Sequence, residues 1–196
     1  MVYQLKVSLK GVRPPVWRRI QVAGDLTLTQ LHQVLQIVMG WTDTHLHQFI
    51  IGGERYAIPS PEDWGERPSD ERKVRLVDFA KAQTRFRYEY DFGDGWEHDL
   101  VVEEATETAP LAPALCIEGR RSCPPEDCGG PFGYAEFLQI IANPKHDEHA
   151  ERLEWIGRKF DPEDFNLALV NQVLAKRGPR TARKRRPSPP FLPEPN

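Results

Sequence analysis

The sequence predicts a single α+β domain, with a mostly antiparallel sheet packed against an N-terminal helix and several C-terminal helices. Three observations support this fold class. Residues 3–10, 16–22 and 46–51 have the alternating apolar and polar pattern of strands. Residues 86–104 have the pattern of two strands joined by a glycine-rich turn. Helical spacing dominates residues 28–39 and the C-terminal third, and strands that precede helices in this way indicate an α+β arrangement.

The first helix has the clearest boundaries in the chain. Thr27 and Gln30 form a capping-box pattern, in which each side chain bonds the backbone N–H of the other residue. Leu28, Leu31 and Leu35 follow helical spacing, and Gly40 is the type of residue that ends a helix. We therefore expect a helix over 28–39 that packs on the sheet and belongs to the core.

Two histidines mark the strand expected next. If the extended pattern begins at His45, then His45 and His47 share one face of the strand. Histidines with this spacing occur in metal sites, where both imidazoles reach the same ion. They also occur in polar packing layers. Both interpretations stand, with His45 and His47 as candidate metal ligands.

The hairpin in residues 86–104 is the strongest structural signal. A three-residue turn with Gly95 in the left-handed conformation pairs Phe92 with Trp96 and Tyr90 with His98. This register collects the aromatic side chains on one face of the hairpin. It therefore predicts that His98 is buried on the apolar face.

The opposite face of the same hairpin is acidic. The register sets Asp91 opposite Glu97 and Glu89 opposite Asp99. Like charges directly opposite each other are unfavourable by about 0.2–1 kcal/mol per pair. Either water and salt screen these carboxylates, or a cation or a basic partner meets this face.

The irregular stretch 116–134 is the second candidate region. Its Pro-Pro and Gly-Gly-Pro steps exclude regular structure, and long ordered loops are more often functional than connective. We expect its Pro124–Gly130 part to lie beside the hairpin turn and to form a functional surface with it. That predicted surface comprises Asp91, Asp94, Gly95, Trp96, Glu97, His98, Pro124, Pro125, Glu126 and Asp127.

Acidic residues and thiols in these segments suggest two kinds of metal site. Glu126 and Asp127 either accept backbone N–H groups of the loop or turn toward Asp91 and Asp94. In the second case the carboxylates suit a hard cation such as Mg²⁺ or Ca²⁺, so Asp91 and Asp94 are further candidate ligands of a divalent metal ion. The Cys123-x4-Cys128 spacing is loose for zinc and needs Cys116 or histidines as well, and buried or free thiols are the simpler interpretation.

Charge is distributed unevenly along the 196 residues, whose net charge is −3. Residues 176–196 hold seven basic residues and one acidic residue, which gives this segment +6 and leaves −9 for the rest. We expect residues 176–196 to be a disordered, proline-rich basic tail after one domain at 1–175. The acidic body argues against broad nucleic-acid contact, whereas the tail could contact nucleic acid non-specifically.

The number of cysteines and the hydropathy of the sequence indicate the cellular compartment of the protein. Three cysteines, an odd number, fit a reducing cytoplasm better than a disulfide framework. No run is long and apolar enough to span a membrane, and the N-terminus has no secretory pattern. We expect a cytoplasmic protein without a membrane partner.

Five motifs occur in a fixed order. They are PPVWRRIQV, LTQLHQVLQIVMGWTDTHLHQF, YEYDFGDGWEH, CPPEDCGGPFGY, and a helical end with Trp155 and FDPEDFN. With these motifs the chain resembles the plasmid pRiA4b ORF-3 family over residues 3–175. The resemblance implies an α+β fold and an association with plasmids and transposons, but no reaction.

Two functions from different classes remain open. The first is an accessory protein of a mobile element, acting as a binding module for an unknown protein partner. The second is a metal-dependent hydrolase or nuclease that uses the His, Asp and Glu residues around 45–47 and 91–98. The enzyme lacks a recognisable nucleophile–base pair and a glycine-rich phosphate loop, so the sequence favours the binding module.

Overall fold

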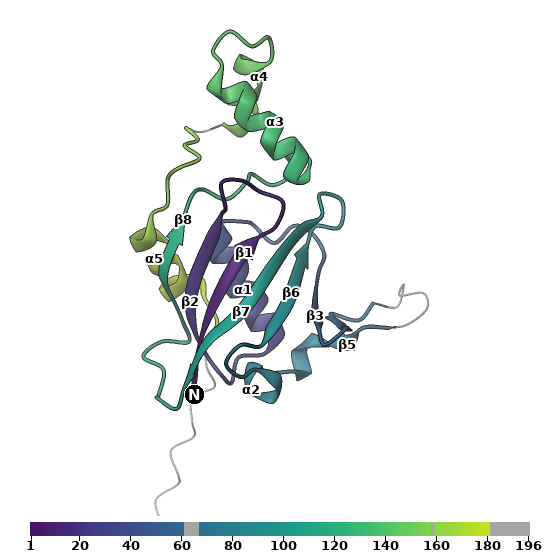
Figure 1. The fold of residues 1–196 in the computed structure, drawn as a ribbon, viewed down its shortest axis with the longest axis vertical. Helices are drawn as coiled ribbons and strands as arrows, with labels where there is room; N and C mark the ends of the chain where they lie inside the picture. The colour runs from purple at the N-terminus through teal and green to yellow at the C-terminus, as the bar shows by residue number, and fades with distance from the viewer. Residues whose placement is uncertain (61–66, 158, 181–196) are drawn as a thin grey trace, which may run out of the picture.

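The computed structural model describes residues 1–60, 67–157 and 159–180. Its strands form one sheet in the spatial order β5-β4-β3-β6-β7-β1-β2-β8 (Figure 1). Neighbouring strands are antiparallel except for β4 and β5. The strands are β1 (Val2–Leu9), β2 (Trp17–Ala23), β3 (His47–Ile51), β4 (Glu54–Ala57), β5 (Ser69–Asp70), β6 (Arg85–Tyr90), β7 (Trp96–Thr106) and β8 (Ala114–Arg120). The helices are α1 (Leu28–Met39), α2 (Leu76–Phe79), α3 (Gly130–Ala142), α4 (His149–Ile156) and α5 (Leu167–Arg177), with a 3₁₀ turn η1 (Glu71–Lys73). The predicted α+β class is confirmed.

Helix α1 lies across one face of the sheet (Figure 1). Thr27 caps its start with both hydrogen bonds of the predicted capping box, and Gly40 ends it with a left-handed φ of 86°. The leucines on its inner face are fully buried with the alternate side chains of β1, such as Leu5 and Val7. This contact forms the core, because each element buries its one apolar face against the other.

The other face of the sheet is polar and carries cross-strand ion pairs. Arg19 of β2 contacts both Glu103 and Glu118, and Lys10 lies 2.6 Å from Glu97. Such one-sided burial is typical of antiparallel sheets. Of the acidic residues that the sequence placed on this face, Glu97 is paired with Lys10, whereas exposed Asp99 has no ion pair among the described residues.

The hairpin of β6 and β7 has a different register from the predicted one. Tyr90 pairs with Trp96 and Tyr88 with His98, so the turn holds five residues, 91–95, instead of three. Asp91 ends the strand early because its Oδ1 accepts the backbone N–H groups of residues 93 and 94, at 3.0 and 3.3 Å. A shift of two residues keeps the paired side chains of both strands on their predicted faces, and the predicted burial of His98 is confirmed. The predicted pairing of Phe92 with Trp96 is wrong, because Phe92 lies in the turn and is 55% exposed.

The predicted pairing of carboxylates across this hairpin is wrong in detail. Glu89 lies opposite Glu97, and Asp99 lies opposite Arg87, whereas Asp91 belongs to the turn. Arg87 lies 3.6 Å from both Glu89 and Glu97. The pair of like charges is therefore neutralised within the chain and needs no external cation.

The C-terminal helices pack less uniformly on the sheet than predicted. Helices α3 and α4 form a pair beyond one end of the strands, whereas α5 lies beside β8 and α1 (Figure 1). Asn166 caps α5, accepting the N–H of Leu169 at 2.9 Å, and the helix continues through Lys176 and Arg177. These two residues of the predicted tail are helical, and residues 181–196 lie outside the described part.

None of the helices in the described ranges is long and apolar enough to cross a membrane.

Candidate functional site

Three segments far apart in sequence meet at one end of the sheet. They are the loop 41–46 after α1, the hairpin turn 91–95, and the loop 122–129 before α3. A hydrogen bond of 3.1 Å from the Gly129 N–H to Oδ2 of Asp94 joins the third segment to the hairpin turn. The predicted proximity of the turn and the proline-rich loop is confirmed. That they form a functional surface remains a prediction.

Glu126 holds the first and third segments together. Its carboxylate accepts the backbone N–H of Thr42 at 3.1 Å, the hydroxyl groups of Thr42 and Thr44, and the phenol O–H of Tyr90. Burial opposes ionisation of Glu126, but these donors outweigh it and lower its pKa. Burial, together with the neighbouring carboxylate, raises the pKa of Tyr90 to about 12. Glu126 thus accepts a backbone N–H group, which was one of its two predicted roles. The N–H belongs to the loop 41–46 and not to the loop of Glu126 itself.

Aromatic rings form the floor beneath these loops. The Trp41 indole donates to the Pro124 carbonyl at 3.0 Å and stacks on Tyr90, with 5.0 Å between ring centroids. The Trp41 ring also makes an edge contact with the His98 ring, and the Trp96 ring lies next to that of Trp41. Both residues are completely buried, so they belong to the support of the predicted surface and not to the surface itself.

His98 is a neutral imidazole in this floor. Its Nδ1 lies 3.3 Å from the Tyr88 carbonyl, and because a carbonyl only accepts, Nδ1 carries the proton. Nε2 is buried without a hydrogen-bond partner. Burial lowers the pKa of His98 to about 4, because the charged form would lose its hydration.

The remaining residues of the predicted surface are divided between the rim and the interior. Gly95 is exposed in the turn, in the left-handed conformation that was predicted. Pro124 and Pro125 are buried residues of the loop 122–129. Glu97 lies on the opposite, polar face of the sheet with Lys10, so the structure separates it from the site.

The two candidate histidines do not act together. His45 lies in the loop before β3, where its Nε2 is 3.6 Å from Oδ2 of Asp91 and 3.1 Å from Oδ1 of Asp127. His47 begins β3 and points to a different cluster. Asp94 is committed to the Gly129 N–H. Of the four candidate ligands, only His45 and Asp91 share a possible metal site.

His47 belongs to a buried polar layer with His32 of α1. The two rings stack face to face, with 3.5 Å between centroids and 3° between planes. His47 pairs with Glu71 at 3.0 Å, and His32 contacts Asp43 and the Tyr88 hydroxyl, each at 2.8 Å. Burial, with a smaller contribution from His47, lowers the pKa of His32 to about 4.

This polar layer was missed in the sequence. His32 and Gln36 are four residues apart and therefore share one side of α1, which was a usable signal of a polar pair on a buried face. Gln36 donates to the Tyr88 hydroxyl at 2.9 Å. Glu71 gave no signal, because it lies in a charged stretch and only the fold buries it.

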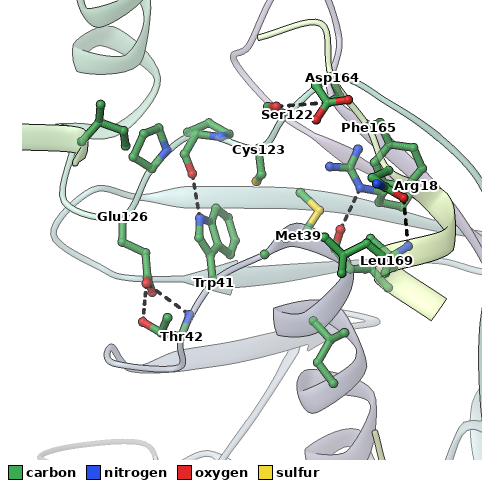
Figure 2. A pocket seen from close by; sticks show the side chains of 18 of the residues that line it. Arg18, Met39, Trp41, Thr42, Ser122, Cys123, Glu126, Asp164, Phe165 and Leu169 are labelled. Atoms are coloured by element: carbon green, nitrogen blue, oxygen red, sulfur yellow. Dashed lines mark hydrogen bonds between the residues drawn. The ribbon is translucent and has the colours of Figure 1, made fainter. Parts of the chain in front are cut away.

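A cleft of about 540 Å³ opens beside the loop 122–129 (Figure 2). The C-terminal end of α1 and Trp41 line one side of it, and the segments of α4 and α5 line the other. Trp155 and Leu169 are 43% and 54% exposed, so the cleft offers large apolar side chains to solvent. Glu126, Asp127 and Asp164 supply carboxylates to its walls.

The sequence of this chain matches a known protein family. Residues 1–169 match the plasmid pRiA4b ORF-3-like protein family. This chain belongs to that family. Three of the motifs that carry the resemblance contain the segments that converge at the site. They are the second motif, at its end GWTDTHLHQF, and the motifs YEYDFGDGWEH and CPPEDCGGPFGY.

Two relatives cover most of this pRiA4b ORF-3-like protein. The "Uncharacterized protein y4hQ" of Sinorhizobium fredii (strain NBRC 101917 / NGR234) is 40% identical over 188 residues, 94% of this chain and 96% of the relative. The crystal structure of a protein of unknown function, MM3350 from Methanosarcina mazei Go1, has a TM-score of 0.74 and 35% identity. The match covers 85% of this chain and 96% of the other. Both names leave the function open.

Among the described residues that line the cleft, the cationic group is the guanidinium of Arg18, and the fold encloses it. Arg18 donates to the carbonyl groups of Val38, Trp17, Arg120 and Arg121 at 2.8–2.9 Å. Its guanidinium also lies 4.2 Å from the centre of the Phe165 ring. Four of its five N–H groups bond backbone carbonyl groups of this family member, so the free charges that the described residues bring to the cleft are negative.

The thiols of this pRiA4b ORF-3-like protein are poor nucleophiles. Burial raises the pKa of Cys128 to about 12 and that of Cys123 still further, so both are protonated at neutral pH. Ser122 donates its hydroxyl to the carbonyl groups of Asp161 and Asp164. Within the described residues, no cysteine joins a group of three possible metal ligands.

Proposed function

We propose that this protein is a binding module whose 540 Å³ cleft accepts a basic, partly apolar segment of a protein partner. The observation that carries the proposal is the combination of exposed Trp155 and Leu169 with unneutralised carboxylates in one cleft. Exposed large apolar side chains that cluster at a concave surface mark binding sites. The carboxylates around these apolar side chains favour an occupant with positive charge.

Charge complementarity favours a basic occupant. Asp164 is exposed, and its carboxylate has no ion-pair partner among the described residues. Glu126 is ionised, and its donors are neutral hydroxyl and amide groups. Among the described residues, the one cation in the cleft wall is Arg18, which is enclosed by carbonyl groups. Lys or Arg side chains flanking an apolar anchor would match both features.

The same cleft offers little support for hydrolysis. The Ser122 hydroxyl bonds backbone carbonyl groups and no basic side chain among the described residues, and the Cys123 thiol is held protonated by burial. Nucleophilic catalysis needs a nucleophile within hydrogen-bond reach of a base. Binding is therefore the function that the cleft supports better.

Fluorescence anisotropy with short labelled peptides tests the proposal. A peptide in which Lys and Arg alternate with Leu and Phe should bind, and its affinity should fall at higher salt. The same peptide with Glu in place of Lys and Arg should not bind. Leu169→Ser and Asp164→Asn should each weaken binding of the basic peptide at least about tenfold, the effect of losing roughly 1.4 kcal/mol of binding energy.

Two variants outside the cleft are matched controls. Leu111→Ser removes a more exposed leucine from the loop between β7 and β8, and Asp99→Asn removes an exposed carboxylate on β7. Both should bind the basic peptide like the wild type. Absent binding of the basic peptide, or equal losses in the control and cleft variants, would overturn the proposal.

The cellular setting is part of the same proposal. The family takes its name from a plasmid reading frame, which supports an accessory role for a mobile element. Free thiols at Cys116, Cys123 and Cys128 support a reducing cytoplasm. A non-specific contact of the basic tail with nucleic acid remains a proposal about residues outside the described ranges.

A further inference from the structure

We propose that His45, Asp91 and Asp127 form a binding site for a divalent transition-metal ion, with Zn²⁺ as the preferred ion. The three side chains come from the three converging segments, and one ligand atom of each lies within 4.8 Å of the others. The site is a feature separate from peptide binding in the cleft, although Asp127 stands at the border between them.

The spacing of the three atoms matches that of ligands around one ion. Nε2 of His45 lies 3.1 Å from Oδ1 of Asp127 and 3.6 Å from Oδ2 of Asp91. Zinc binds nitrogen and oxygen ligands at about 2.0–2.2 Å, so adjacent ligands of one ion stand roughly 3–3.6 Å apart. A small inward movement of exposed Asp127 would complete the contact.

His45 has no other partner for the nitrogen that faces the carboxylates. Its Nε2 is shielded from solvent, and the carboxylate of Asp127 at 3.1 Å is an ion-pair contact that does not have the geometry of a hydrogen bond. Buried polar atoms are nearly always paired, and an unpaired one needs an explanation. An ion between Nε2 and the two carboxylates supplies the missing partner. The ring remains partly open to solvent, which gives the ion a path of entry.

Asp91 has an oxygen left over for the ion. Its Oδ1 is occupied by the N–H groups of Gly93 and Asp94, at 3.0 and 3.3 Å. Its Oδ2 is the atom that faces His45. The backbone bonds thus fix the orientation of a carboxylate whose second oxygen points into the site, as supporting hydrogen bonds do for metal ligands.

The ligand set selects the type of ion. An imidazole with two carboxylates suits Zn²⁺ or Mn²⁺, whereas Mg²⁺ and Ca²⁺ prefer oxygen ligands alone. Affinity for nitrogen and oxygen ligands is higher for Zn²⁺ than for Mn²⁺. Three protein ligands leave at least one position for water.

The group of buried His32, partly buried His47 and exposed Asp43 is the rival set of ligands. Its two imidazole rings stack with 3° between their planes, so their nitrogen lone pairs lie in separate parallel planes instead of pointing toward one ion. Both nitrogens of His32 are also occupied, by Asp43 and the Tyr88 hydroxyl. An ion there would have to break the network that holds it.

Isothermal titration of the metal-free full-length protein with ZnCl₂ tests the site. The wild type should bind one Zn²⁺ per chain more tightly than Mn²⁺, and Mg²⁺ should give no heat of binding. His45→Ala and Asp127→Asn should each lower Zn²⁺ affinity by at least about tenfold. Asp127 is exposed, so its variant should fold even if His45→Ala does not.

Three further variants decide between sites. His146→Ala removes an exposed histidine, Asp43→Asn alters the rival layer, and Cys128→Ser removes the nearest partly accessible thiol. All three should bind Zn²⁺ like the wild type. The proposal is overturned if the wild type binds no Zn²⁺, if His45→Ala and Asp127→Asn bind it unchanged, or if Asp43→Asn or Cys128→Ser abolishes binding.

Discussion

Acidification should destabilise this protein through His98. The folded-state pKa of His98 is about 4, below the ordinary value of 6.5 that it has when unfolded. Protons therefore bind the unfolded chain more strongly. The contribution of His98 to stability is complete above pH 6.5 and is lost as the pH falls from 6.5 toward 4. Between pH 7 and pH 5 this linkage removes about 2 kcal/mol from the free energy of unfolding.

Urea unfolding at pH 7 and pH 5 measures this loss. The interval avoids most carboxylate titration, which occurs at lower pH. His32 has a similarly lowered pKa, so the wild type should lose more than His98 alone explains. His98→Phe should lose about 2 kcal/mol less than the wild type over this interval, because the titrating group is absent.

The control is His146→Gln, which replaces an exposed histidine. It should lose as much stability as the wild type. If His98→Phe and the wild type have the same pH dependence, His98 is not a buried neutral imidazole and the reasoning is refuted.

Two further predictions concern the supports of the site. Gly130→Ala should cost at least about 2 kcal/mol in urea unfolding, because a Cβ would lie 2.2 Å from a carbonyl oxygen at a φ of +67°. Gly52→Ala, at a φ of +60° with open space around it, should cost only about 1 kcal/mol, and equal costs would contradict the contact. Glu71→Ala should cost about 2 kcal/mol, because it leaves buried His47 unpaired. Glu97→Ala, in an exposed pair, should cost less than about 1 kcal/mol, and the reverse order would refute the buried layer.

Local signals in the sequence were sufficient for the main elements. Thr27, Gln30 and Gly40 mark the ends of α1 through hydrogen bonds that involve neighbouring residues only. The faces of β6 and β7 follow from alternation, which a shift of two residues does not alter. The exact register was not predictable in this way, because it depends on Asp91, whose side chain closes a longer turn.

The candidate site depended on contacts that alternation does not encode. The proximity of Asp94 and the proline-rich loop was inferred from the special backbone geometry that both require. The partners of Glu126 lie in the loop after α1, and no spacing in the sequence relates them. The separation of His45 from His47 has a similar cause. Strand β3 begins at His47, so His45 lies in the preceding loop and does not share the face of the strand.

The site residues that were missed are buried by the fold. Glu71 lies in a charged segment that is typical of a surface loop, yet its carboxylate is fully enclosed beside His47. The cleft is lined by residues from α1, the loop 122–129 and α5. Only a three-dimensional structure brings these together.

The indole N–H resonances of the ¹⁵N-labelled protein test the binding cleft most directly. Trp155 lines the cleft, whereas Trp17 lies on the opposite face of the sheet beneath Lys6 and Arg19. Trp155→Phe and Trp17→Phe assign the two signals. On addition of the basic, partly apolar peptide, the Trp155 signal should shift progressively to saturation and the Trp17 signal should stay in place. A shift of Trp17 with Trp155 unmoved, or no shift of either signal, would contradict the account.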